Sequence, residues 1–300
     1  MNFSKLMLGT VQFGLNYGIA NTAGKPSYET ARNIIQAACE NGVNCLDTAA
    51  GYGDSEEVLG RVLTELKLKD KMQVISKVPG ITQQNLSESA AERFIVESVE
   101  KSLVRLGIER LAVCLFHVEH DIRYIGILKK LEDKGLIGGA GISLDTSQYC
   151  ENVVAAGIKY VQLPYNILDR RFDTFFPLAQ QEGIAVFTRS VYLQGLLLMP
   201  EDKIRESLLE VVPIRRKLAC LADDGGMDVA ELCMRFVLSN PAITSILTGV
   251  DNVEQLRHNL QLLEKGPLPA ALYRKVKATV PLLEENIIRP VLWNKTAAGR

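Results

Sequence analysis

Four side chains that could together move a proton lie within the first 120 residues. Each of three short apolar runs ends in a polar residue, Asp47, Lys77 or His117, and Tyr52 lies on the glycine-rich turn after Asp47. A buried lysine is costly unless an opposite charge meets it, and Asp47, from the neighbouring predicted strand, is placed to do so. These residue types predict a site for acid–base chemistry.

Tyr52 is the candidate proton donor. A free tyrosine has a pKa of about 10, and a nearby ammonium group lowers it, which would make the phenol a usable general acid or base. His117 can hydrogen-bond the same reacting oxygen. With Asp47 and Lys77, the two side chains would form a proton-donating and oxyanion-stabilising group for a carbonyl. The competing interpretation is an acid at a strand end and a half-buried tyrosine in an ordinary loop.

The stretch 44–60 predicts the elements that position Asp47 and Tyr52. It reads as the end of a buried strand, a glycine-rich turn, and a helix capped by Ser55. Apolar residues recur in this helix at helical spacing. Small residues around Tyr52 would let the backbone turn tightly and approach a ligand.

Strands and helices alternate along the rest of the chain. We expect strands at 6–9, 43–47, 74–77, 111–117, 139–143, 160–164, 184–189 and 243–248. Helices are expected to start at Ser27, Ser55, Ser89 (capping box with Glu92) and Thr146, and to span 124–134, 174–182, 201–222, 227–239, 253–264 and 270–286. Glycines 42, 107, 135, 157 and 183 precede apolar strand entries, as glycine does in αβ loops.

This alternation predicts the α/β class and one domain over residues 1–300. Eight βα units indicate a (β/α)8 TIM barrel, with a short N-terminal strand or hairpin and a C-terminal helix and tail. A doubly wound sheet is the alternative, but the first unit lacks a G-x-G-x-x-G fingerprint. Function in a barrel lies at the carboxyl ends of the strands. All eight predicted ends are polar: Thr10, Asp47, Lys77, His117, Ser143, Gln162, Arg189 and Thr248.

Composition narrows the class of protein. The formal net charge is −1, with acids and bases interspersed, so neither a nucleic-acid partner nor an anionic membrane surface is expected. No apolar run approaches the ~20 residues of a membrane span. The six cysteines form no C-x-x-C pair, so we interpret them as small core residues in a reducing cytoplasm.

The motifs identify a resemblance to the aldo-keto reductases over nearly the whole chain. LGTVQFG (8–14), LDTAAGYGDSEEVLG (46–60), ISKV with Lys77 and LFHVEH with His117 resemble the family's catalytic segments. VQLPYN (161–166), SVYLQGLL (190–197) and TGVDNVEQLRHN (248–259) resemble later ones. The resemblance implies reversible hydride transfer between a nicotinamide cofactor and a carbonyl. Tyr52 would protonate the oxygen, Asp47 and Lys77 would tune it, and His117 would position the carbonyl; no metal is implied.

Cofactor contacts follow from the same resemblance. Ser143 and Gln162 resemble the residues that hold the nicotinamide carboxamide, and Ser190, Leu193 and Gly195 resemble the pyrophosphate loop. Gln255 and Asn259 resemble adenine contacts, and the loop before the last barrel helix can bind a phosphate through backbone N–H groups. The expected cofactor-binding set is Gly9, Thr10, Val11, Asp47, Ser143, Gln162, Arg189, Ser190, Leu193, Gly195, Thr248, Gly249, Val250, Asp251, Gln255 and Asn259.

Three positions depart from the family pattern. Leu144 replaces a frequent asparagine, and Arg189 replaces an aromatic residue, although its guanidinium plane could stack on the nicotinamide. TGVDN lacks the cation that often pairs with the adenosine 2′-phosphate. Asp251 would repel that phosphate and could accept from a free 2′-hydroxyl, or it could simply cap the helix. The family favours NADPH and Asp251 favours NADH, so the choice stays open, with NADPH slightly ahead.

The expected partner is a small-molecule carbonyl or sugar, bound by a monomer or weak homo-oligomer. Glu119, His120 and Tyr165 would make the substrate pocket polar, although a solvated loop is the simpler interpretation of Glu119 and His120; Trp293 would help wall the pocket. Two other functions remain open. One is a cofactor-sensing binding subunit, since the family includes channel-associated β subunits, and the other is a non-redox barrel lyase or isomerase.

Overall fold

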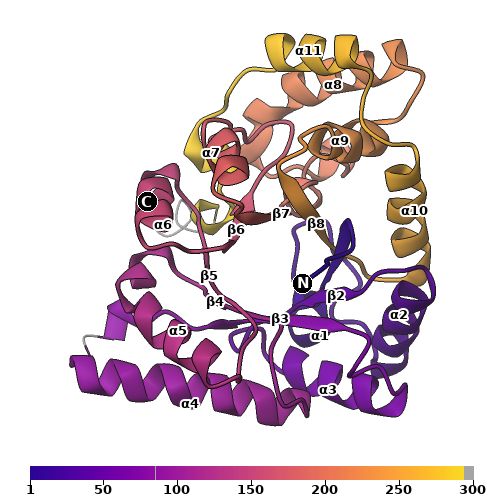
Figure 1. Ribbon diagram of the computed structural model, residues 1–300. Coiled ribbons are helices and arrows are strands. Elements are labelled where there is room, and N and C mark those ends of the chain that lie inside the picture. The colour runs from indigo at the N-terminus through magenta and orange to yellow at the C-terminus, as the bar shows by residue number, and fades with distance from the viewer. Residues whose placement is uncertain (85, 294–300) are drawn as a thin grey trace.

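Eight parallel strands form a closed barrel at the centre of the molecule. The computed structural model describes residues 1–84 and 86–293 (Figure 1). The strands are β1 (Leu6–Gly9), β2 (Cys45–Asp47), β3 (Gln73–Val78), β4 (Val113–Phe116), β5 (Ala140–Ser143), β6 (Tyr160–Pro164), β7 (Ala185–Arg189) and β8 (Ile243–Gly249). Each pairs with its sequence neighbours, and β8 pairs back onto β1, with Leu6 opposite Ile246. The predicted (β/α)8 barrel is confirmed and the doubly wound alternative is wrong.

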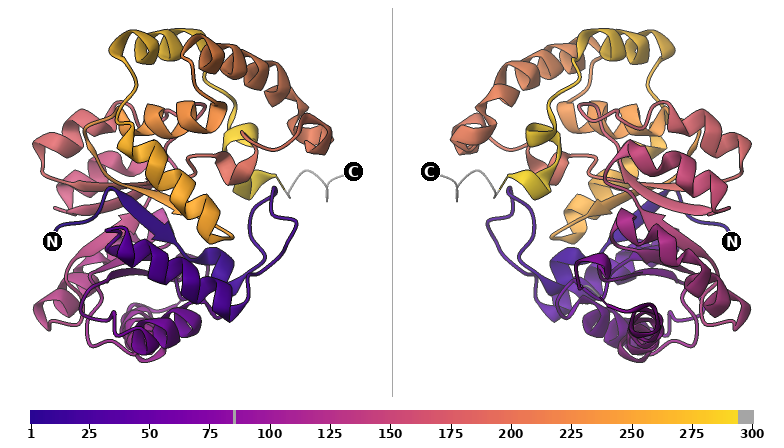
Figure 2. Two further views of the ribbon diagram at one scale, coloured as in Figure 1. Left: turned by 90° about the vertical axis from the view of Figure 1, so that its right-hand side faces the viewer. Right: turned by 90° about the vertical axis from the view of Figure 1, so that its left-hand side faces the viewer.

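Helices cover the outside of the barrel. They are α1 (Val11–Gly14), α2 (Tyr28–Glu40), α3 (Ser55–Glu65), α4 (Glu88–Leu106), α5 (Ile125–Asp133), α6 (Cys150–Ala155), α7 (Phe175–Gln181), α8 (Val212–Asp224), α9 (Val229–Leu238), α10 (Val253–Glu264), α11 (Ala270–Thr279) and α12 (Glu285–Ile288). Short 3₁₀ turns include η2 (Glu119–Tyr124), η3 (Ser147–Tyr149), η4 (Leu193–Gly195), η5 (Glu201–Lys203), η6 (Glu206–Val211) and η7 (Pro290–Leu292). Figure 2 shows α8 and α11 lying side by side outside the barrel, joined by an ion pair between Asp224 and Lys275.

Two apolar cores hold the barrel together. The larger fills the layer between strands and helices, and the smaller fills the barrel interior with Phe3, Met7, Cys45, Ile75, Val113, Leu115 and Phe187. Phe3 packs edge-on against Phe187, with ring centroids 5.0 Å apart. An interior filled with apolar side chains leaves the polar residues at the carboxyl ends of the strands for function. The described chain begins directly with the first barrel strand, and no hairpin precedes it within residues 1–84.

The five glycines expected at αβ loops have the predicted backbone conformation. Positive φ angles occur at Gly42 (80°), Gly107 (61°), Gly135 (78°), Gly157 (62°) and Gly183 (62°). Gly107 ends α4 in the left-handed region, where its N–H bonds the carbonyl of Leu103. The repeated glycine therefore marks the point at which each of these helices turns back into the barrel.

Two predicted helix caps are wrong, because each helix is capped at a residue one or two positions earlier than expected. The side chain of Ser87, rather than that of Ser89, accepts from the N–H of Ala90 at the start of α4. Ser55 is already inside α3 and does not cap it. Its hydroxyl donates instead to the carbonyl oxygen of Thr10, 2.8 Å away, which ties the start of α3 to the end of β1.

Both long predicted C-terminal helices are broken. Residues 201–222 contain η5 and η6 before α8 begins at Val212, and residues 270–286 contain α11 and then α12. Proline lies at both breaks. Pro213 occupies the first turn of α8, where its missing N–H is tolerated. Pro281 follows Val280, the C-cap of α11, whose ψ of 120° is the extended conformation favoured before proline.

All six cysteines are free thiols. Cys45, Cys114 and Cys233 are buried, as expected of small core residues, but Cys220 on α8 is exposed and that part of the prediction is wrong. None of the described helices is long and apolar enough to cross a membrane. The prediction of one domain over residues 1–300 stays a prediction, because Asn85 and residues 294–300 lie outside the described chain.

Candidate active site

A buried ion pair lies at the carboxyl end of the barrel. Lys77 Nζ is 2.7 Å from both carboxylate oxygens of Asp47, and neither side chain is more than 2% exposed. In the pairing of β2 with β3, Asp47 lies opposite Ile75, which is two residues before Lys77 on β3. The ammonium group also donates to the carbonyl oxygen of Thr48 at 2.9 Å. The expected neutralisation of Lys77 by Asp47 is therefore present in the structure.

The phenol of Tyr52 and the imidazole of His117 lie beside this pair. Lys77 Nζ is 3.3 Å from the phenolic oxygen and 4.8 Å from the ring centroid of Tyr52. The rings of Tyr52 and His117 meet edge to face, with centroids 5.6 Å apart. The structure thus brings together all four residues that the sequence predicted for proton transfer, from β2, the β2–α3 turn, β3 and the end of β4.

Close backbone packing fixes the turn that carries Tyr52. A Cβ added to Gly14 would lie 1.7 Å from the carbonyl oxygen of Tyr52, and one on Gly53 would lie 2.4 Å from the carbonyl oxygen of Gly14. Only glycine fits such contacts. The small residues of this turn thus let it pack against the end of α1, whereas the sequence suggested that they make room for a ligand.

The pKa of Tyr52 departs from the sequence-based expectation. Removal of its phenol from water raises the pKa above its ordinary value, and this effect exceeds the lowering by the Lys77 ammonium; the Asp47 carboxylate adds a smaller increase. The predicted net lowering is therefore wrong for the protein without ligand. The sequence showed the charge of Lys77 but not the loss of water around the phenol.

The other two titratable groups have opposite shifts. Burial alone would lower the pKa of Lys77, but Asp47 and Tyr52 raise it above its ordinary value, so the ammonium form persists. Burial, assisted by the positive charges of Lys77 and Arg189, lowers the pKa of His117 to about 3. His117 is therefore a neutral imidazole near neutral pH, which can donate one hydrogen bond from one ring nitrogen and accept one at the other.

Three of the remaining strand-end residues are bonded to protein groups. Gln162 Nε2 donates to Asp47 Oδ1 at 2.7 Å, and Asn259 Nδ2 donates to Thr248 Oγ1 at 3.4 Å. Arg189 Nη2 donates to Asp145 Oδ1 at 3.1 Å and to the carbonyl oxygen of Leu144 at 3.2 Å. These bonds hold the polar ends of β6, β7 and β8 in fixed positions around the ion pair. Ser143, at the end of β5, is buried.

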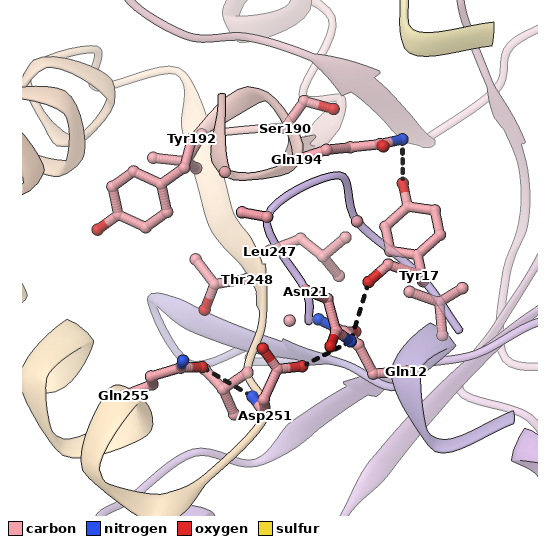
Figure 3. A pocket seen from close by; sticks show the side chains of 18 of the residues that line it. Gln12, Tyr17, Asn21, Ser190, Tyr192, Gln194, Leu247, Thr248, Asp251 and Gln255 are labelled. Atoms are coloured by element: carbon pink, nitrogen blue, oxygen red, sulfur yellow. Dashed lines mark hydrogen bonds between the residues drawn. The ribbon is translucent and has the colours of Figure 1, made fainter. Parts of the chain in front are cut away.

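A cavity of about 450 Å³ is lined by Tyr52 and by residues of the loops after β1, β7 and β8. Figure 3 shows the part of it around Gln12, Tyr192 and Asp251. Its lining includes Tyr52 and most of the predicted cofactor-binding residues, namely Gly9, Thr10, Val11, Asp47, Arg189, Ser190, Gly195, Thr248, Gly249, Val250, Asp251, Gln255 and Asn259. Ser143, Gln162 and Leu193 are buried behind the wall rather than lining it.

A segment that sequence reasoning missed closes the cavity on one side. We call residues 15–26, between α1 and α2, the strap. Tyr17 of the strap accepts a hydrogen bond at its hydroxyl from Gln194 Nε2 at 3.1 Å, and Asn21 Nδ2 donates to Asp251 Oδ1 at 3.4 Å (Figure 3). The strap therefore contacts both the β7 and the β8 loops. Gly18 and Gly24, which adopt φ angles of 95° and 78°, were the signals in the sequence of a shaped loop there.

Four residues expected around the substrate do not line this cavity. Glu119 is buried, and its carboxylate accepts from the N–H groups of Asp145 and Thr146 at 2.7 and 2.8 Å, so the solvated-loop interpretation is wrong. Tyr165 is fully buried and donates its hydroxyl to Asp173. Trp293 is also buried, and its indole donates to the carbonyl oxygen of Ile287. His120 is exposed, as one interpretation expected.

The lining offers a hydrogen-bond acceptor to a ligand. Gln12 is 8% exposed, and its Oε1 has no hydrogen-bond partner within the described chain, so a buried acceptor is available to a ligand donor. A Cβ on Gly249 would lie 2.3 Å from the Gln12 amide, so glycine at this position leaves the room that the Gln12 side chain occupies. Among the residues described, no group of three or more His, Cys, Asp or Glu side chains is arranged to hold a metal ion.

Comparison with known proteins adds independent information. The sequence model of the Aldo/keto reductase family matches residues 5–280. The chain is 30% identical over 279 residues to aldo-keto reductase YhdN of Bacillus subtilis, covering 84% of this chain and 83% of that protein. It is 25% identical over 303 residues to the NADH-specific methylglyoxal reductase of Escherichia coli, covering 86% and 93%. The solved structure of an aldo-keto reductase from Klebsiella pneumoniae in complex with NADPH has a TM-score of 0.71 at 21% identity, covering 94% and 93%.

Proposed function

Because the chain belongs to the aldo-keto reductase family, we propose that Tyr52 is the general acid and base for hydride transfer to the carbonyl of a small aldehyde, ketone or sugar. Membership alone makes the chain a nicotinamide-dependent carbonyl oxidoreductase, and proteins of this family use NADPH or NADH. The identity of the proton donor and the class of substrate are the parts that we propose. They rest on the geometry around Tyr52.

The observation that carries the proposal is the contact between the Tyr52 phenol and the Lys77 ammonium. At 3.3 Å, Lys77 can stabilise the phenolate that remains after Tyr52 has given its proton to a carbonyl oxygen. Asp47 holds Lys77 in this position through two 2.7 Å bonds. Tyr52 and Lys77 are therefore arranged to donate a proton in the reduction and to take it back in the oxidation.

His117 has a positioning role in this proposal. Because the low pKa keeps its imidazole neutral, its N–H can donate to the carbonyl oxygen without adding a competing acidic proton. The edge-to-face contact with Tyr52 sets the ring beside the same oxygen. The phenol and the imidazole would thus approach one carbonyl oxygen from two sides.

The cavity beyond Tyr52 would hold the cofactor. When bound in its reduced form, the nicotinamide supplies a hydride to the carbonyl carbon. Arg189 and Thr10 line the end near Tyr52, and the β8–α10 loop lines the far end. The strap and the loop after β7 would enclose the middle and exclude water. Hydride on carbon and the Tyr52 proton on oxygen together give the alcohol.

The test is Tyr52→Phe, which removes the acidic proton while keeping the ring. Turnover of 4-nitrobenzaldehyde should fall by about 10²- to 10⁴-fold, the range for a lost general acid. Cofactor binding, followed by the fluorescence of the reduced nicotinamide, should be retained. Tyr28→Phe is the matched control, since the Tyr28 hydroxyl donates to Glu65 on the outside of the barrel.

Other outcomes separate the competing functions. Full activity in Tyr52→Phe would make the proposed mechanism wrong. Tight cofactor binding by the unaltered chain, with negligible turnover of aldehydes, ketones and sugars, would favour the cofactor-sensing subunit. A chain that binds no nicotinamide cofactor at all would point to a lyase or isomerase.

A further inference from the structure

Asp251 lines the cavity on the β8–α10 loop, and it is not the residue that caps the adjoining helix. β8 ends at Gly249, and the N-cap of α10 is Asn252, whose side chain accepts from the N–H of Gln255 at 2.9 Å. The interpretation of Asp251 as a plain helix cap is therefore wrong. Figure 3 shows its carboxylate among the side chains that line the cavity, beside Asn21 and Gln255.

Neutral groups surround this carboxylate. Asn21 Nδ2 donates to Asp251 Oδ1 at the long distance of 3.4 Å, and the backbone N–H of Asp251 donates to Gln255 Oε1 at 2.8 Å. The side chain of Gln255 also hydrogen-bonds the Asp251 carboxylate, whose two oxygens together offer about four acceptor sites. The side chain thus retains an acceptor for a ligand hydroxyl group.

No lysine or arginine offsets the charge of Asp251 within the described lining of the cavity. Arg189 is the one such residue there, and it is bonded to Asp145 at the Tyr52 end. Lys25 of the strap forms an ion pair with Asp54 instead. Arg257 on α10 is exposed and does not line the cavity. The cavity lining also includes a histidine, His258.

We propose that Asp251 makes the chain select NADH over NADPH. The inference rests on the proposed function, because proton transfer at Tyr52 places the nicotinamide at one end of the cavity and the adenosine ribose at the other. A 2′-phosphate carries a charge of about −1.5 to −2 at neutral pH, which a nearby carboxylate repels in a partly dehydrated cavity. A free 2′-hydroxyl can donate to that carboxylate, as ribose hydroxyls do to an acid in other dinucleotide sites.

The experiment is a set of calorimetric titrations that need no turnover. The purified chain is titrated with NADH and NADPH, and also with the adenosine fragments 5′-AMP and 2′,5′-ADP. NADH and 5′-AMP should each bind at least about tenfold more tightly than the 2′-phosphorylated partner, since tenfold corresponds to about 1.4 kcal/mol. Asp251→Arg should reverse the preference, and Asp251→Asn should narrow it.

Glu254→Gln is the matched control for long-range charge. Glu254 lies three residues further along on α10, is exposed, and does not line the cavity, but its replacement changes the net charge by the same amount as Asp251→Asn. Its NADH-to-NADPH ratio should equal that of the unaltered chain. Equal or tighter binding of NADPH by the unaltered chain would overturn the inference, as would equal shifts in both variants, and either result would leave the proposed carbonyl chemistry intact. Failure to bind either dinucleotide would instead overturn the proposed function and the inference with it.

Discussion

At the scale of single residues, burial decides the protonation states of the candidate site. Tyr52 and His117 are both shifted towards their neutral forms, because each loses water on folding. Lys77 loses water too, but Asp47 contacts it with both oxygens and holds it charged. The result is a phenol that keeps its proton until a carbonyl accepts it, beside a cation that stabilises the phenolate.

The low pKa of His117 predicts a pH-dependent contribution to stability. In the unfolded chain its pKa is about 6.5, so between that value and about 3 the unfolded state binds a proton that the folded state does not. The contribution of His117 to the free energy of unfolding is therefore fully present above pH ~6.5, and it is lost as the pH falls towards 3. His117→Asn should flatten the acid side of the stability curve, by at most about 1.4 kcal/mol per pH unit.

Urea unfolding midpoints across this pH range would measure the effect. His120→Asn serves as the control, because His120 is an exposed histidine three residues away. An acid limb of unchanged slope in His117→Asn would mean that the native imidazole takes up its proton at the ordinary pH. In that case the neutral hydrogen-bond donor that we propose for the carbonyl would be wrong.

At the scale of elements, a two-residue shift at the start of α4 gives a direct test of its capping. Ser87 caps the helix, whereas the sequence analysis predicted Ser89 with Glu92. Ser87→Ala should destabilise the protein by about 1 kcal/mol, the typical loss for a helix cap. Ser89→Ala is the matched control and should change the unfolding midpoint little. A larger loss from Ser89→Ala than from Ser87→Ala would contradict the cap seen here.

At the scale of the whole molecule, one carboxylate joins three segments that are distant in sequence. Asp145, after β5, accepts from Arg189 at the end of β7 and from Arg289 after α12, the latter with Nε 2.9 Å from Oδ2. The C-terminal segment is thereby fastened over the barrel mouth, next to the arginine that lines the cavity. Because the side chain of Arg289 is only 19% exposed, its ion pair with Asp145 should contribute more to stability than a fully solvated pair would.

Arg289→Met should release that segment without unfolding the barrel. Loss of about 1 kcal/mol would raise amide hydrogen exchange across residues 285–293 by about fivefold. Mass spectrometry of the exchanged peptides measures this. Lys275→Met is the control, because Lys275 and Asp224 are both more than half exposed and their pair should contribute little. Unchanged exchange in Arg289→Met would show that apolar packing alone holds the segment.

Local patterns in the sequence were sufficient to predict the barrel and the residue types of the site. Strong local signals carried this information: glycines at helix ends, apolar strands, and polar residues at the strand ends such as Asp47, Lys77 and His117. These depend on near neighbours in the chain, so they can be read without a structure. Membership of the aldo-keto reductase family agrees with them.

The effects of water and of distant segments on those residues could be seen only in the folded chain. The net rise in the pKa of Tyr52 depends on atoms from several strands and loops, and the contact between Asn21 and Asp251 joins residues 230 positions apart. Glu119 and Tyr165 look available in the sequence but are buried and bonded. Solvent exclusion and long-range contacts exist only after the chain has folded, and no local pattern of residues specifies them.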